Sequence, residues 1–205
     1  MITYHISFCI ATGKPLFGYR TLRTSVLATQ GELSQAALRD RLITYSKGND
    51  MEADNAWFST EQYLKLDKGF GVSELEKELT RTHAGVVIID PLYKFMSGRL
   101  TDEYDMRQLF DRLDILMAKH HFATIIIHHD RKSQLVDGIP VSHGDEDMFG
   151  SFLMNCSDTI IRTQTTNRDG EVILTFEKAR HSAEILKPIT IQVNRATLSF
   201  TRKGG

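Results

Sequence analysis

The sequence of 205 residues is long enough for one sizeable hydrophobic core, and a single α/β domain is the simplest expectation. Apolar residues make up 41% and charged residues 25%, as in ordinary soluble globular proteins. The formal net charge of −1 excludes a bulk basic field for gripping nucleic acid, so any such binding must come from local loops.

The cysteines and the apolar runs indicate the compartment. Cys9 and Cys156 lie far apart and lack the spacing of a metal site, which is typical of proteins in a reducing cytosol. No apolar run approaches the roughly 20 residues that span a bilayer, and no basic n-region marks a signal peptide. The sequence therefore predicts a cytoplasmic protein without a membrane partner.

The first elements in chain order are a helix, a strand and a second helix. Residues 1–12 have the pattern of a helix that ends at Gly13. Residues 25–29 read as a short buried strand, and residues 34–45 follow helical spacing with Ser34 as their N-cap.

The next stretch predicts less regular structure. Residues 46–70 are polar and irregular, with Trp57 and Phe58 as hydrophobic anchors. Residues 72–82 are amphipathic and predict a helix capped by Ser73.

The clearest unit follows. Residues 86–90 are a β-branched run that stops at Asp90-Pro91, and residues 123–128 are a second fully apolar strand. A long helix over 103–121 joins them, so the two strands are expected to be parallel and buried on both faces.

The C-terminal part predicts a different arrangement. A polar loop over 131–147 and a short helix precede a set of alternating, hairpin-like strands with a tight turn at Asp169-Gly170. The predicted fold class is therefore α/β, with a mostly parallel sheet, helices on both faces and antiparallel C-terminal strands.

Reactive side chains follow three of the predicted strands, where open α/β sheets bind their ligands. Asp90 after four apolar residues fits the Walker B pattern, an acid that holds Mg²⁺ through water, but an aspartate can also begin a turn there. Glu32 fits a general base for an attacking water, and alternatively it complements a helix dipole.

Two further pairs are candidates. His128 and His129 are adjacent and so point to opposite faces of a strand; one imidazole sensing a γ-phosphate fits better than a metal pair. Lys178 and Arg180 share one face of a strand, either as solvated cations or as a finger that places positive charge on the γ-phosphate of a neighbouring subunit.

Segments spread over nearly the whole chain resemble the RecA-like P-loop ATPases of the RepA hexameric replicative helicase type, in the broad AAA-type ATPase group of phage and plasmid proteins. These segments are ATGKPLFGY, VLATQGELS, VVIIDPL, TIIIHHDRK, FGSFLMNCSDTII and FEKAR. The resemblance implies a RecA-like three-layer α/β/α core, ATP and Mg²⁺ as cofactors, and a ring of six identical subunits. It also implies hydrolysis between subunits and movement along single-stranded DNA.

The resemblance also implies individual roles. Glu32 matches the catalytic glutamate and Asp90 the Walker B aspartate, while Lys178 and Arg180 match a K-x-R finger acting across the interface. The segment from His128 to Lys132, which includes His129 and Arg131, matches the motif that couples the γ-phosphate to the DNA loop.

One matching segment departs from the family. Gly150, Ser151 and Asp158 match a "GSS…AD" motif, but Phe152 replaces the second serine and Ser157 the alanine. Arg131 and Lys132 are the cationic end of the loop 131–149, whose remainder is acidic. Together with Gly150 and Ser151, which follow this loop, they are the candidate DNA contacts.

The phosphate-binding loop is the missing motif. No segment fits G-x-x-x-x-G-K-[ST], and with Lys14 as the lysine, Pro15 would stand where a hydroxyl must meet Mg²⁺. We therefore expect residues 1–205 to be one RecA-like core without its first strand and P-loop, impaired in ATP binding on its own. The alternatives are a non-hydrolysing DNA- or partner-binding subunit and a recombination-type RecA-like ATPase.

Overall fold

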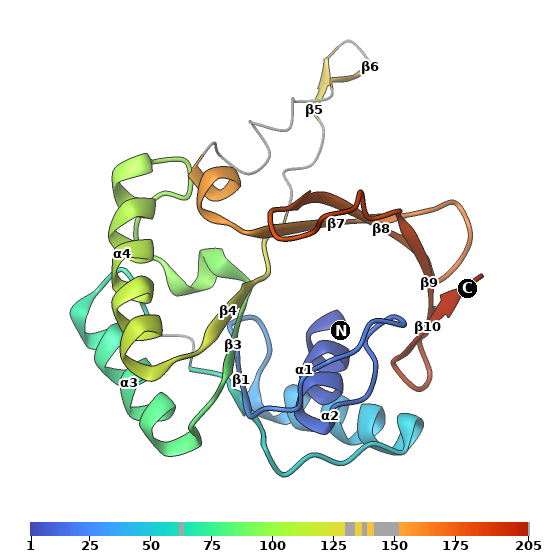
Figure 1. Ribbon diagram of the computed structural model, residues 1–205, viewed down its shortest axis with the longest axis horizontal. Coiled ribbons are helices and arrows are strands. Elements are labelled where there is room, and N and C mark those ends of the chain that lie inside the picture. Colours follow the sequence, from blue (N-terminus) through green and yellow to red (C-terminus); the bar gives the residue numbers. More distant parts are fainter. Residues whose placement is uncertain (62–63, 130–133, 137–138, 142–151, 205) are drawn as a thin grey trace.

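Four parallel strands form the centre of the molecule, in the order β2-β1-β3-β4 (Figure 1). The computed structural model describes residues 1–61, 64–129, 134–136, 139–141 and 152–204, and only the backbone within 134–141. The central strands are β1 (Val26–Gln30), β2 (Ala56–Ser59), β3 (Val86–Asp90) and β4 (Ala123–Ile126).

Helices cover both faces of this sheet, as the continuous apolar runs of its strands predicted (Figure 1). Side chains alternate between the faces: Leu27 and Ile89 join the core under one helix pair, and Ile88 joins the core on the other side. The helices are α1 (Ile2–Thr12) and α2 (Gln35–Asn49) on one face, and α3 (Gly69–Thr82) and α4 (Glu103–His120) on the other. The predicted three-layer α/β/α fold is confirmed.

A second, antiparallel sheet has the order β10-β9-β8-β7 and arches over α1 (Figure 1). The Asp169-Gly170 turn between β7 and β8 is confirmed, with Gly170 at a φ of 68°. A small core of Leu174, Ile189 and Ile191 holds the sheet together. Its strands are β7 (Thr159–Thr165), β8 (Glu171–Ala179), β9 (Ile189–Asn194) and β10 (Ser199–Lys203).

The helix caps test the local predictions. The Ser34 cap is confirmed, because its Oγ accepts the Ala37 N–H at 3.3 Å. The Ser73 cap is wrong: α3 already begins at Gly69, and the Ser73 hydroxyl donates to the Gly69 carbonyl inside the helix.

Two segments expected to be irregular contain regular structure. The stretch 46–70 includes β2, which pairs in parallel with β1 over four residues. The loop 131–147 includes an antiparallel hairpin of β5 (Gln134–Val136) and β6 (Ile139–Val141). A 3-10 turn, η1 (Leu92–Phe95), directly follows β3.

A buried histidine ties α1 to α2 and to the second sheet. His5 is 8% exposed, and its Nδ1 lies 2.7 Å from the Tyr45 hydroxyl. The ring centroids of Phe17 and Phe200 each lie 5.1 Å from the centroid of the His5 ring. Burial lowers the pKa of His5 from 6.5 to about 4.

This histidine should make the protein sensitive to acid. Because burial disfavours protonation of His5 in the folded state, the unfolded state binds more protons at this residue below pH 6.5. The contribution of neutral His5 to stability is therefore fully present above pH 6.5 and is lost as the pH falls toward 4. We expect the free energy of unfolding to fall by about 2–3 kcal/mol from this group as pH drops toward 4. Urea unfolding at several pH values measures the slope. His5→Gln should flatten it; equal slopes in the two proteins would contradict this assignment.

Candidate functional site

The site begins where β1 and β3 end side by side. Gln30 and Asp90, the last residues of the two strands, are register partners, and the Gly31 N–H donates to the Asp90 carbonyl at 2.9 Å. Asp90 is 9% exposed, and Glu32 lies two residues beyond the end of β1. The predicted neighbourhood of Glu32 and Asp90 at the carboxyl edge of the sheet is therefore present.

The start of α1 reaches the same place. The Thr3 hydroxyl donates to Asp90 Oδ2 at 2.6 Å. Burial lowers the pKa of the Met1 amino group, and the Asp90 and Glu32 carboxylates oppose that shift, so the helix start lies in the field of both acids. Sequence reasoning missed Thr3, because the contact joins residues 87 positions apart and no motif signals it.

Glu32 is exposed, and both its backbone N–H and its carboxylate make hydrogen bonds. The buried Gln30 side chain accepts the N–H groups of Glu32 and Leu33 at 2.7 Å each, which shapes the turn after β1. The Tyr93 hydroxyl donates to Glu32 Oε1 at 2.6 Å, and this hydrogen bond raises the pKa of the tyrosine. Neither Gln30 nor Tyr93 was predicted.

The two histidines follow β4 at the same edge of the sheet. His128 is half-buried and His129 exposed, with the His129 ring centroid 6.5 Å from that of Tyr93. The described part of the chain contains no group of three or more His, Cys, Asp or Glu residues placed to hold a metal. The predicted DNA contacts Arg131, Lys132, Gly150 and Ser151 lie outside the described residues.

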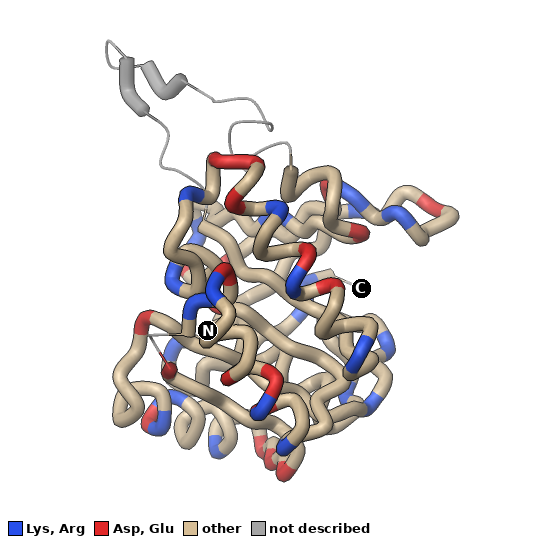
Figure 2. The backbone as a smooth tube through the Cα atoms, turned by 90° about the vertical axis from the view of Figure 1, so that its left-hand side faces the viewer, with Lys and Arg blue, Asp and Glu red and all other residues tan. Residues whose placement is uncertain are grey.

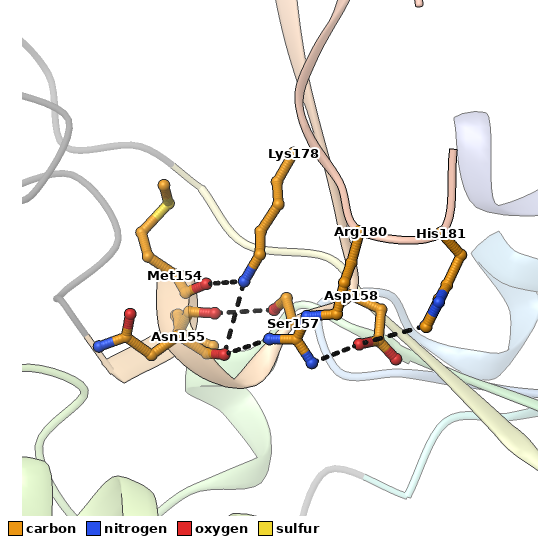
Figure 3. A network of polar contacts seen from close by, with 8 residues as sticks. Met154, Asn155, Ser157, Asp158, Lys178, Arg180 and His181 are labelled. Carbon is orange, nitrogen blue, oxygen red and sulfur yellow. Dashed lines mark hydrogen bonds and ion pairs between the residues drawn. The ribbon is translucent and has the colours of Figure 1, made fainter. Parts of the chain in front are cut away.

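Lys178 and Arg180 converge on one helix end of their own chain (Figure 3). The Lys178 ammonium donates to the Met154 carbonyl at 2.6 Å, and Arg180 donates to the Asn155 carbonyl at 3.1 Å and to Asp158 at 2.8 Å. Carbonyls at the end of the helical turn 152–156 lack helical partners, and cations there are favoured by the helix dipole. Lys178 on β8 and Arg180, one residue beyond the end of that strand, thus reach the same helix end, as the shared face predicted for the pair implies.

The Gly13-Lys14 pair forms a helix cap, as the sequence predicted once the P-loop was rejected. Gly13 is left-handed, with a φ of 77°, and its N–H donates to the Cys9 and Ile10 carbonyls. The exposed Lys14 ammonium donates to the Asp50 carbonyl at 3.3 Å. These contacts are those of a helix C-terminus and not of a phosphate cradle.

The donor atoms at the edge of the sheet suit a hard cation. The Asp90 carboxylate and the Thr3 hydroxyl offer oxygen ligands only, which is the set that Mg²⁺ prefers. A bound Mg²⁺ would supply positive charge for nucleotide phosphates. Figure 2 shows basic and acidic residues interspersed along the backbone of the described residues.

The fold with its parallel strand order is similar to that of solved structures of RecA-like ATPases. A structure described as an ATPase domain matches with a TM-score of 0.64 and 11% identity over 88% of this chain and 75% of that one. A DnaB-like replicative helicase matches with a TM-score of 0.63 and 13% identity, over 86% of this chain and 51% of that one. The RadB recombinase matches with a TM-score of 0.59 and 14% identity, over 88% of this chain and 80% of that one. At sequence identities this low, the structural similarity establishes the fold alone.

The sequence itself gives the family. A family model described as an AAA domain matches residues 1–134, more than half of the chain, and the chain belongs to the AAA domain family. No curated protein matches it in sequence. None of the helices in the described residues is both long and apolar enough to cross a membrane.

Proposed function

We propose that residues 1–205 form one ATPase core of the RepA hexameric helicase type, which works in a ring on single-stranded DNA and is impaired in ATP binding on its own. One observation carries this proposal: β1 and β3 end in register, which brings Glu32 and Asp90 to the same sheet edge beside the start of α1. The RecA-like fold of helicase and recombinase structures supports it.

In this proposal each group has one task. Asp90 would hold Mg²⁺ through water, and Glu32 would accept a proton from the water that attacks the γ-phosphate of ATP. One imidazole of His128 and His129, or a neighbouring backbone group, would sense the γ-phosphate while the other packs. Lys178 and Arg180 would act on the nucleotide of the neighbouring copy. The proposed DNA contacts are Arg131, Lys132, Gly150 and Ser151.

A second candidate is a subunit that binds DNA or a partner and hydrolyses nothing. It is favoured because no G-x-x-x-x-G-K-[ST] segment occurs in the 205 residues and because Gly13-Lys14 caps α1. Backbone N–H groups of such a loop normally cradle the phosphates.

Calorimetry on this chain tests the phosphate site. We expect no measurable affinity for Mg·ATP, because Asp90 and Glu32 alone offer a nucleotide no phosphate donors. Fluorescence anisotropy with a labelled oligo-dT, on the same folded preparation, tests the DNA contact and should show binding that weakens with salt. Micromolar Mg·ATP binding would mean that the phosphate site is elsewhere, and absent oligo-dT binding would remove DNA from the proposal.

A further inference from the structure

One side chain connects two parts of the candidate site. Tyr93 lies on η1, three residues beyond Asp90, and is 43% exposed. Its hydroxyl donates to Glu32 after β1, and its ring centroid lies 6.5 Å from that of His129 after β4, with the two rings tilted by 58°. Tyr93 therefore bridges the ends of β1 and β4, which lie on opposite sides of β3 in the sheet.

The turn that carries Tyr93 is held firmly. Phe95 is fully buried, and its carbonyl accepts the Leu66 N–H at 2.8 Å. The Leu92 N–H donates to the Ile127 carbonyl at 2.9 Å. Just beyond the turn, the buried Asp67 carboxylate accepts the Ser97 and Gly98 N–H groups at 3.0 and 3.2 Å; these contacts fix the backbone on both sides of Tyr93.

Within the part of the chain that the structure describes, the Glu32 carboxylate has one hydrogen-bond partner, the Tyr93 hydroxyl. The Glu32 backbone is fixed through Gln30, but the exposed side chain would sample several rotamers in water without a partner. A 2.6 Å hydrogen bond from a phenol on a fixed turn restricts those rotamers, and hydrogen bonds to charged acceptors are among the stronger ones.

We propose that Tyr93 is a positioning residue that fixes the Glu32 carboxylate, and that its ring makes this position depend on His129. The consequence for hydrolysis rests on the function proposed above. The His129 ring lies 6.5 Å from the Tyr93 ring, centroid to centroid, so in this proposal a change in the position of His129 alters the Glu32 carboxylate through the Tyr93 ring.

The test follows the ionisation of Tyr93 by NMR of ¹³C-labelled tyrosine, in the chain as it stands and without nucleotide. Tyr93→Phe assigns the signal. Glu32→Ala should shift the Tyr93 pKa down toward its ordinary value, because the acceptor that raises it is gone. Glu74→Ala is the matched control, since that carboxylate pairs with Lys77 on α3, and it should leave the titration unchanged.

Each outcome decides a part of the proposal. If the Tyr93 pKa is unchanged in Glu32→Ala, the positioning role is overturned. If the Tyr93 pKa falls both in Glu32→Ala and in His129→Ala, the results support the contact with Glu32 and its dependence on His129. A fall in Glu32→Ala alone would overturn the dependence on His129. Because no step needs ATP, failure of the proposed ATPase would leave these results standing, and the reverse also holds.

Discussion

Arg180→Ala is expected to lower ATP hydrolysis by about 10³–10⁵-fold, the usual contribution of an arginine finger, in a polypeptide that joins this chain to a phosphate-binding loop. Nucleotide binding should remain largely intact, because the guanidinium acts on charge that develops in the transition state. Steady-state hydrolysis and calorimetric ATP affinity measure the two effects separately. Loss of binding alone would argue against a finger.

The contacts of Arg180 within its own chain make its control important. Arg180 pairs with Asp158, so its removal also disturbs the end of the turn 152–156. Arg195→Ala removes a more exposed ion pair, with Asp169, at the turns of the same antiparallel sheet, and should leave hydrolysis unchanged.

A mixing experiment separates action across an interface from action within one chain. Arg180→Ala chains keep Glu32, and Glu32→Gln chains keep Arg180, so mixed rings would contain some interfaces with both groups intact. We expect mixing to restore part of the activity. Two inactive variants that stay inactive together, in rings shown to be mixed, would place both groups in one subunit.

The central strands were predictable because burial on both faces demands a continuous apolar run. β3 follows the apolar run of residues 86–89 and ends at Asp90, before Pro91. β2 was missed because it has only four residues, and its Trp57 is 36% exposed beside Arg81, so no apolar run marks it. Its strand character comes from pairing with β1, which is a tertiary effect.

The candidate site was predictable only where a residue follows a strand. Glu32 and Asp90 could be placed together because parallel strands share a carboxyl edge. Thr3 and Tyr93 could not, since their hydrogen bonds to these acids join residues 87 and 61 positions apart. The spacing of Lys178 and Arg180 gave their common face, but the helix end that they contact depends on how β8 lies against residues 152–158.

Phe95→Ala should cost about 3–5 kcal/mol of unfolding free energy, the range for truncating a fully buried phenylalanine. Phe95 packs in the core between the sheet and α3 and α4, on the turn that carries Tyr93. Because whole domains are stable by only about 5–15 kcal/mol, this loss should be evident as a lower urea midpoint in the chain as it stands.

Tyr93→Ala in the same turn is the matched control. Tyr93 is 43% exposed and gives up one hydrogen bond, so its removal should cost on the order of 1 kcal/mol. If Tyr93→Ala lowers the free energy of unfolding as much as Phe95→Ala does, the Tyr93 side chain stabilises the fold rather than positioning the Glu32 carboxylate. If only Phe95→Ala causes a large loss of unfolding free energy, the buried core fixes the turn. The exposed Tyr93 side chain is then not needed for stability and can serve to position Glu32.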